Sequence, residues 1–120
     1  MGKFKIVVLT NPTAGQEDEY NDWYTNRHLR DVVAIPGIRS AQRFKLMDAM
    51  GFEHRHRYLA IYEIESDDPH AVIQELLSRR GTESMVISDA LDMDTAVGGV
   101  FEPCSEVIRG SEPVERSDAA

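Results

Sequence analysis

The order of strand-like and helix-like segments limits the fold of this chain more than any other feature of its sequence. Short runs of β-branched and apolar residues predict strands, and two longer segments with capping signals predict helices. In chain order we expect a strand at 3–12, a helix at 17–34, strands at 38–47 and 54–66, a helix within 66–81 and a strand within 95–108. This βαββαβ order predicts an α+β, ferredoxin-like fold, a four-stranded antiparallel sheet with two helices on one face.

Acidic, proline and glycine residues mark the ends of both expected helices. Acidic residues at 17–19 lie at the positive end of the first helix dipole, and Pro36 follows the end of that helix. The second helix has Pro69 in its first turn and Gly81 beyond its last turn. Residues 82–94 fit either a short helix or a loop.

Chain length and the position of these elements predict one domain. A chain of 120 residues is long enough for a single core of modest size. Residues 1–108 contain every expected helix and strand, so we expect them to form the domain. Residues 109–120 are small, polar and charged, which predicts a disordered tail.

Apolar side chains occur on both faces of the expected strands, although two helices cover only one face. Phe4, Ile6 and Val8 alternate with Val7 and Leu9 in the first strand. Leaving several hundred Å² of apolar surface in water would forgo on the order of 10 kcal/mol of burial free energy. We therefore expect a homodimer in which two sheets pack face to face.

Composition excludes several classes of partner. The net charge of −8 argues against nucleic acid, because phosphate binding needs a basic stripe. The longest apolar runs are too short to cross a bilayer, so we expect no membrane partner. No secretory leader opens the chain, and the single cysteine, Cys104, cannot form an internal disulfide. Both features predict a cytoplasmic protein.

The stretch EYNDWYTNRHLRD, residues 19–31, gives the first helix an unusual set of polar aromatic side chains. Tyr20, Tyr24 and His28 follow one another at four-residue spacing, so they share one helix face, and Trp23 flanks it. One interpretation is an ordinary buried face whose hydroxyl groups and ring nitrogens are satisfied locally. The other is a pocket wall, where Tyr24 offers a hydroxyl group and His28 exchanges a proton near neutral pH.

Residues 11–44, NPTAGQEDEYNDWYTNRHLRDVVAIPGIRSAQRF, resemble the EthD-like branch of the dimeric α/β-barrel superfamily. Its members typically carry Asn-Pro after the first strand, an acidic-aromatic helix with a WY…H core, and IPG before the second strand. The resemblance implies a dimer of sheets and a cleft between each sheet and its helices. By position in the motif, it implies that Trp23, Tyr24 and His28 lie at this cleft, with Asn11 as a further candidate.

The activities of this superfamily include cofactor-free oxygenation of polycyclic phenols, lactone isomerisation, lyase or decarboxylation chemistry on aromatic compounds, haem breakdown and accessory roles in catabolic operons. Several of these need an apolar pocket and one base that generates a delocalised anion. The resemblance therefore implies a lyase, isomerase or monooxygenase without cofactor, acting on a small aromatic or polyketide-like compound in a catabolic or biosynthetic pathway. One alternative is a non-catalytic accessory or ligand-binding dimer of a catabolic operon, and another is haem binding and degradation.

Six residues make up the expected site. His28 is the expected acid/base, and Tyr24 is its expected catalytic partner. Four further residues are expected to bind the substrate: Asn11, Tyr20, Trp23 and Tyr62. The strand pattern alone does not say which face of the sheet Tyr62 occupies.

Two further groups of polar residues fit ordinary surface positions better than sites. His54 and His56 share a strand face and could bind a metal, but the sequence places no third ligand, so we expect no metal site. Arg39, Arg43 and Lys45 alternate along one strand. They could bind an acidic substrate group, although a solvated edge is the favoured interpretation.

Overall fold

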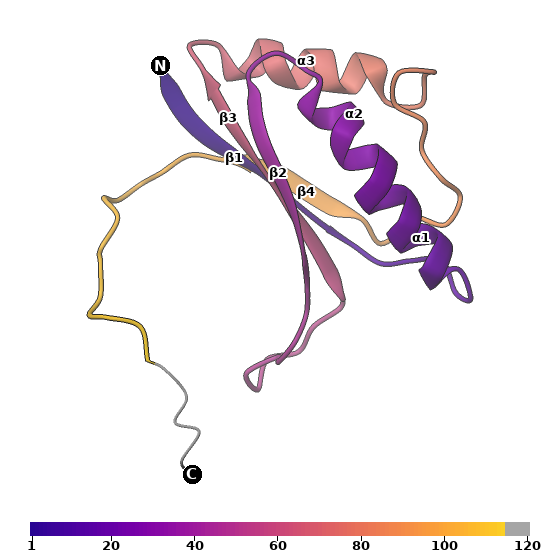
Figure 1. The fold of residues 1–120 in the computed structure, drawn as a ribbon, viewed down its shortest axis with the longest axis horizontal. Helices are drawn as coiled ribbons and strands as arrows, with labels where there is room; N and C mark the ends of the chain where they lie inside the picture. Colours follow the sequence, from indigo (N-terminus) through magenta and orange to yellow (C-terminus); the bar gives the residue numbers. More distant parts are fainter. Residues whose placement is uncertain (115–120) are drawn as a thin grey trace.

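The computed structural model describes residues 1–114, which form a four-stranded antiparallel sheet with helices packed against it (Figure 1). The strands lie in the order β2-β3-β1-β4. In chain order the elements are β1 (Gly2–Thr10), α1 (Glu17–Trp23), the π-helical turn η1 (Tyr24–His28), α2 (Leu29–Val33), β2 (Ile38–Lys45), β3 (Tyr58–Ser66), α3 (Pro69–Arg79) and β4 (Val97–Phe101). The predicted βαββαβ order and ferredoxin-like fold are confirmed.

Pairing between the two central strands assigns each of their side chains to one face of the sheet. β1 and β3 pair along their whole length without a register shift. Ile6 lies opposite Tyr62, and both side chains are buried on the face that the helices cover. The next pair, Val7 and Ile61, points to the opposite face. The sheet therefore has two apolar faces, as the strand pattern predicts.

The first helical segment is not one continuous α-helix. It consists of α1, the π-helical turn η1 and α2. The backbone N–H of Leu29 donates to the carbonyl of Tyr24, five residues earlier, which is the hydrogen bond of a π-turn. The four-residue spacing of tyrosines and histidine predicts a regular helix, so the sequence pattern misses this turn.

α3 begins as its capping residues predict. The carboxylate of Asp68 accepts a hydrogen bond of 3.2 Å from the amide of Ala71, and Pro69 occupies the first turn. Val72 on this helix is buried against the turn that enters β2. In that turn Gly37 has a φ of 97°, and an added Cβ would lie 2.9 Å from the Val72 side chain. Only glycine fits this position without strain.

The expected strands extend beyond those that form. β2 ends at Lys45 instead of residue 47, and β3 starts at Tyr58 instead of residue 54. Residues 54–57 pair with no strand, because β1 ends at Thr10 and the chain then turns toward α1. β4 stops at Phe101 instead of continuing toward residue 108.

The helix-free face of the sheet keeps apolar side chains in contact with solvent. Its central residues Leu9, Leu59 and Ile61 are only half-buried. Around them Phe44 is 42% exposed and Phe101 is 58% exposed. A contiguous apolar surface of this kind is characteristic of association surfaces.

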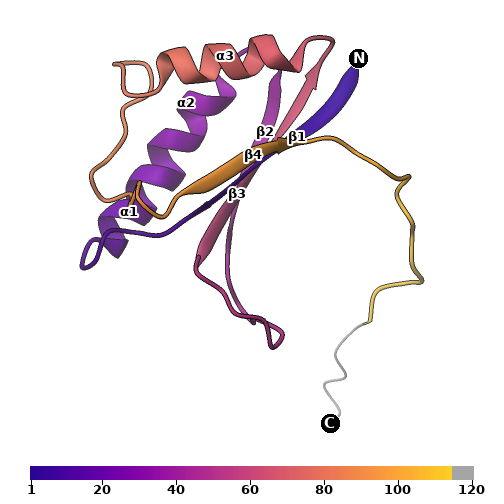
Figure 2. The same ribbon diagram turned by 180° about the vertical axis from the view of Figure 1, so that it is seen from behind.

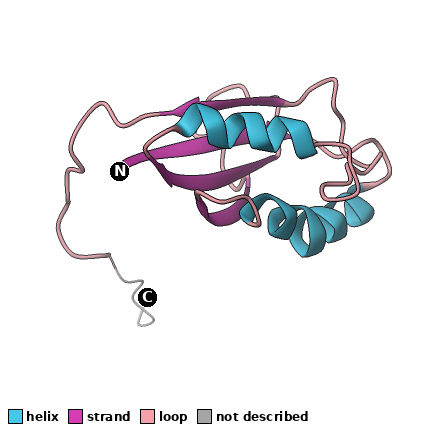
Figure 3. Cartoon of the chain, turned by 90° about the horizontal axis from the view of Figure 1, so that it is seen from above, coloured by secondary structure: helices cyan, strands magenta, loops and turns pink. Residues whose placement is uncertain are grey.

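Beyond β4 the chain leaves the sheet as an extended segment that runs away from the helices (Figures 2 and 3). Every residue from 102 to 114 is exposed. The predicted disordered tail covers 109–120, and its residues 115–120 lie outside the described part of the chain. Among residues 1–114, no helix has the length and hydropathy that crossing a membrane requires.

Candidate functional site

A cavity of about 120 Å³ lies between the helices and the sheet. Its walls come from β1, β3, the first helical segment, the C-terminal end of α3 and the segment that leads to β4. The lining residues are Ile6, Val8, Thr10, Tyr24, His28, Val32, Tyr62, Leu76, Arg80, Met85, Ile87, Leu91, Met93 and Ala96. The cavity is therefore mainly apolar and lies between the sheet and its helices, where the resemblance implies a cleft.

His28 is held in the cavity wall by two aromatic rings. Its imidazole stacks on Trp23, with ring centroids 4.7 Å apart and 27° between the ring planes. It also meets the ring of Tyr24 edge-on at 5.0 Å. Residues five apart point in different directions on an α-helix, whereas a π-turn brings them onto one face. The π-turn η1 thus explains how Trp23 and His28 stack.

The environment of His28 favours the neutral imidazole. Within residues 1–114, its Nδ1 atom is buried and has no hydrogen-bond partner. Burial lowers the pKa of His28 from 6.5 to about 4, because desolvation penalises the charged ring. The sequence predicts proton exchange near neutral pH, whereas the pKa of the buried ring lies below that range. Burial among apolar and aromatic side chains is the physical reason.

Two tyrosines place hydroxyl groups at the same cavity. Tyr62 lies on the helix-covered face, and its hydroxyl donates to that of Tyr24 at 3.4 Å. Burial raises the pKa of Tyr24 to about 12 and raises the pKa of Tyr62 well above its usual value. Both phenols are therefore neutral hydrogen-bond donors at physiological pH.

Tyr20 and Trp23 lie behind the cavity wall instead of lining it. Tyr20 is 0% exposed, and its hydroxyl group bonds to the hydroxyl of Thr10, which does line the cavity. The indole N–H of Trp23 donates to the carbonyl of Val86 at 3.1 Å. The expectation that these two residues touch the substrate therefore finds no support in the geometry. They position Thr10 and His28.

Asn11 lies away from the cavity. Its side-chain amide donates to the carbonyl of Arg55 at 2.7 Å and accepts from the backbone N–H of Arg57 at 2.9 Å. The side-chain nitrogen and the side-chain oxygen of Asn11 therefore both hold the loop before β3. The structure therefore gives Asn11 contacts to this loop and places it outside the cavity lining.

Several residues at the cavity are not predicted by the sequence pattern. Met85 and Met93 come from a segment whose pattern fits either a helix or a loop, and Ala96 lies at the start of the last expected strand. Arg80 forms a short basic cluster with Arg79 at the end of α3. In the sequence such a cluster is typical of an ordinary surface position. Only the three-dimensional path of the chain brings these residues to the cavity.

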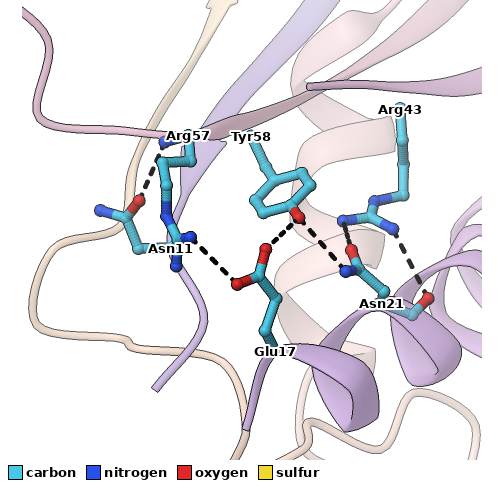
Figure 4. Close-up of polar contacts among 6 residues, drawn as sticks. All are labelled: Asn11, Glu17, Asn21, Arg43, Arg57 and Tyr58. Carbon is cyan, nitrogen blue, oxygen red and sulfur yellow. Dashed lines mark hydrogen bonds and ion pairs between the residues drawn. The ribbon is translucent and has the colours of Figure 1, made fainter. Parts of the chain in front are cut away.

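A polar network fixes α1 against the start of β3 and the middle of β2 (Figure 4). Its members are Asn11, Glu17, Asn21, Arg43, Arg57 and Tyr58. The Tyr58 hydroxyl donates to the carboxylate of Glu17 and accepts from the side-chain amide of Asn21 at 3.2 Å. Hydrogen bonds from Tyr58 and Arg57 hold the pKa of Glu17 below its usual value. This network fixes α1, which continues directly into the π-turn η1 that carries Tyr24 and His28.

Arg43 extends this network beneath the tyrosine rings. Its guanidinium lies 4.6 Å from the ring centroid of Tyr24 and 5.1 Å from those of Tyr20 and Tyr58. It also donates to the side-chain oxygen of Asn21 at 2.9 Å. The interpretation of Arg43 as part of a solvated edge is therefore wrong, because three aromatic faces and an amide hold its charge.

Within residues 1–114, neither the side-chain groups nor the cavity has the features of a metal or haem site. Within residues 1–114, no three His, Cys, Asp or Glu side chains gather as metal ligands would. The Nε2 atom of His56 lies 2.6 Å from the carbonyl oxygen of Thr95. The cavity of about 120 Å³ is smaller than the roughly 300–1,000 Å³ of ordinary small-molecule pockets. Its residues do not fit a haem macrocycle in this conformation.

Comparison of sequences gives one curated relative and no matching family model. Core atranone cluster protein 1 of Stachybotrys chlorohalonatus (strain IBT 40285) is 37% identical over 62 residues, or 52% of this chain and 25% of that protein. The chain therefore spans about a quarter of the length of this relative.

Comparison of structures decides the fold group. At3g17210 of Arabidopsis thaliana matches with a TM-score of 0.66 and 14% identity over 88% of this chain and 99% of that one. An ethyl tert-butyl ether D (EthD) family protein of Bacillus halodurans C-125 matches with a TM-score of 0.50 and 13% identity, covering 86% and 99%. This chain has the ferredoxin-like fold of these proteins.

The same fold is also found in a protein that degrades haem. MhuD of Mycobacterium tuberculosis, whose structure holds two haems in its active site, matches with a TM-score of 0.57 and 17% identity, covering 87% of this chain and 98% of that one. At these identities the likeness shows a shared fold, so the activity of this chain has to be argued from its site.

Proposed function

We propose that this protein is an enzyme that needs no cofactor and uses His28 to move a proton on a small aromatic or polyketide-like compound. The observation that carries the proposal is that His28 lines the cavity while its Nδ1 atom is buried without a partner among residues 1–114. A buried polar atom without a partner costs free energy. A proton-donating group of a substrate in the cavity would remove that cost.

The chemistry follows from the charge states of the three polar side chains. Neutral His28 accepts a proton from an acidic O–H or C–H group, which leaves an imidazolium ion and a delocalised substrate anion. The hydroxyl group of Tyr24 or Tyr62 donates a hydrogen bond to the oxygen that carries the developing charge. Return of the proton to another atom gives isomerisation, and loss of a leaving group gives a lyase reaction. Reaction of the anion with dioxygen gives monooxygenation.

The lowered pKa of His28 results from burial of the ring. A negative charge that develops beside the ring stabilises the imidazolium form and raises the pKa. A substrate that becomes anionic therefore strengthens the base that deprotonates it. An uncharged compound without an acidic proton gains nothing from this arrangement.

The volume of the cavity limits the substrate. The cavity of about 120 Å³ is somewhat smaller than the apolar cavity of about 150 Å³ that holds benzene, so it limits the substrate to about one small aromatic ring. A larger polyketide-like compound requires movement of the flexible side chains of Met85 and Met93, which line the cavity. The name of the curated relative refers to the atranone cluster, which supports a biosynthetic setting for the proposed reaction.

We also propose that the protein forms a homodimer through the helix-free face of its sheet. The helix-free face presents Leu9, Leu59 and Ile61 with Phe44 and Phe101 around them. Two such faces packed together would bury the apolar surface in a two-fold arrangement. The printed descriptions of other solved structures with this fold call them dimeric ferredoxin-like proteins, from Thermobifida fusca YX and Jannaschia sp. CCS1.

Hydrogen–deuterium exchange at carbon tests the proposed proton transfer. Phenols and aryl ketones are incubated with the protein in D₂O, and C–H to C–D exchange is followed by NMR. We expect the wild-type protein to accelerate exchange in at least one compound and His28→Gln to lower that rate by about 100-fold or more. His70→Gln, which changes an exposed histidine on α3, should keep the full rate. An unchanged rate in folded His28→Gln would refute the role of His28.

The second candidate function is a ligand-binding dimer without catalysis. The small cavity volume and the low pKa of His28 favour it, because both restrict catalysis more than binding. This function predicts that aromatic compounds bind and that none shows accelerated exchange. Haem binding is tested separately by adding haemin and recording the Soret band.

A further inference from the structure

Arg80 is fixed at the cavity by the backbone on both of its sides. Its own N–H donates to the carbonyl of Leu76 at 3.1 Å. The N–H of the following residue, Gly81, donates to the carbonyl of Met85 at 2.8 Å. Leu76 and Met85 both line the cavity. The residue is therefore held at the cavity wall although its side chain is exposed to solvent.

The positive charge of Arg80 is not neutralised within the described part of the chain. Among residues 1–114, its guanidinium forms neither an ion pair nor a side-chain hydrogen bond. The neighbouring Arg79 differs, because its Nε atom lies 3.2 Å from the carboxylate of Glu75. Arg80 is therefore an exposed, unpaired cation on a residue that lines a mainly apolar cavity.

The remaining polar side chains of the cavity are largely engaged with one another. The hydroxyl of Thr10 bonds to that of Tyr20, and the hydroxyl of Tyr62 donates to that of Tyr24. Among the described residues that line the cavity, His28 has a buried Nδ1 atom without a partner, and Arg80 has a guanidinium without an ion pair or a side-chain hydrogen bond. A ligand that satisfies both needs an acidic proton in the cavity and an anionic group at its exposed side.

We propose that Arg80 binds the carboxylate of the substrate, so that the substrate class is a small aromatic carboxylic acid. The ring occupies the apolar cavity, and the carboxylate remains at the solvent-exposed guanidinium, where its desolvation cost is low. A guanidinium offers two parallel N–H donors that match the two oxygens of a carboxylate. This inference rests on the proposed function, because the aromatic acid would be the compound that His28 deprotonates.

Binding of two probes of similar shape tests the inference. Benzoate carries the carboxylate, and benzamide replaces it with a neutral group of similar size. The protein has one tryptophan, Trp23, which stacks on His28, so its fluorescence reports binding at the cavity. The titrations use the full-length wild-type protein, Arg80→Gln, Arg80→Lys and the matched control Arg79→Gln.

We expect the wild-type protein and Arg79→Gln to bind benzoate at least about 10-fold more tightly than benzamide. Arg80→Gln should bind the two probes equally, and Arg80→Lys should keep part of the preference because it keeps the charge. Equal binding of both probes by the wild-type protein would overturn the assignment of Arg80, as would a preference that survives in Arg80→Gln. Those results would leave the proposed proton transfer standing, whereas failure of both probes to bind would overturn both proposals.

Discussion

Replacing Ile61 by lysine is expected to convert the proposed homodimer into a monomer. Ile61 pairs with Val7 of β1 and Gln42 of β2, so it lies in the middle of the helix-free face. In a dimer of packed sheets, each protomer would bury an unpaired ammonium group in this apolar centre. The effective desolvation cost of such an ion is several kcal/mol. We therefore expect the dissociation constant of the dimer to rise by about 1,000-fold or more.

Sedimentation equilibrium over a range of protein concentrations measures this change. Leu77→Lys is a suitable control, because Leu77 is an apolar residue of α3 that is already 44% exposed. This control should leave the dimer intact. A wild-type protein that sediments as a monomer at every concentration would contradict the account, and so would a dimer that persists in Ile61→Lys.

Acidification is expected to destabilise the protein through His28. Above pH 6.5 the imidazole is neutral in both the folded and the unfolded chain, so it adds no pH dependence. Between pH 6.5 and about 4 the unfolded chain binds a proton that the folded chain does not, which lowers the free energy of unfolding. The pKa difference corresponds to a loss of about 3 kcal/mol across this range.

Chemical denaturation at several pH values isolates this effect when the wild-type protein is compared with His28→Gln. Carboxylates also titrate in this range, but they do so in both proteins. The variant should therefore lose about 3 kcal/mol less stability than the wild-type protein on acidification to pH 4. His70→Gln, at an exposed position, should follow the wild-type curve. Parallel curves for wild type and His28→Gln would show that the imidazole is not desolvated as described.

The architecture could be predicted from the sequence because it depends on local patterns. Alternation of apolar residues in the strands gives the two faces of the sheet, which the pairing of Val7 with Ile61 confirms. Asp68 and Pro69 set the start of α3 through capping contacts only a few residues long. These local signals do not depend on contacts with distant parts of the chain.

The candidate site could be predicted only in part, because it depends on contacts between distant segments. The four-residue spacing brings Tyr24 and His28 to the same cavity, and the strand places Tyr62 beside them. The π-turn that stacks His28 on Trp23 has no signal in the periodicity. Asn11 matches the motif but braces a loop 44 residues away in sequence. Only the folded structure reveals such long-range contacts.

The central claim is that the imidazole of His28 borders a space that a small aromatic molecule can enter. The most direct measurement is the intermolecular nuclear Overhauser effect between bound phenol and the protein. Phenol carries no carboxylate, so this measurement is independent of Arg80. The account predicts contacts from the phenol ring protons to the rings of His28 and Tyr62, which share the cavity. Contacts confined to the helix-free face of the sheet, or none at saturating phenol, would contradict it.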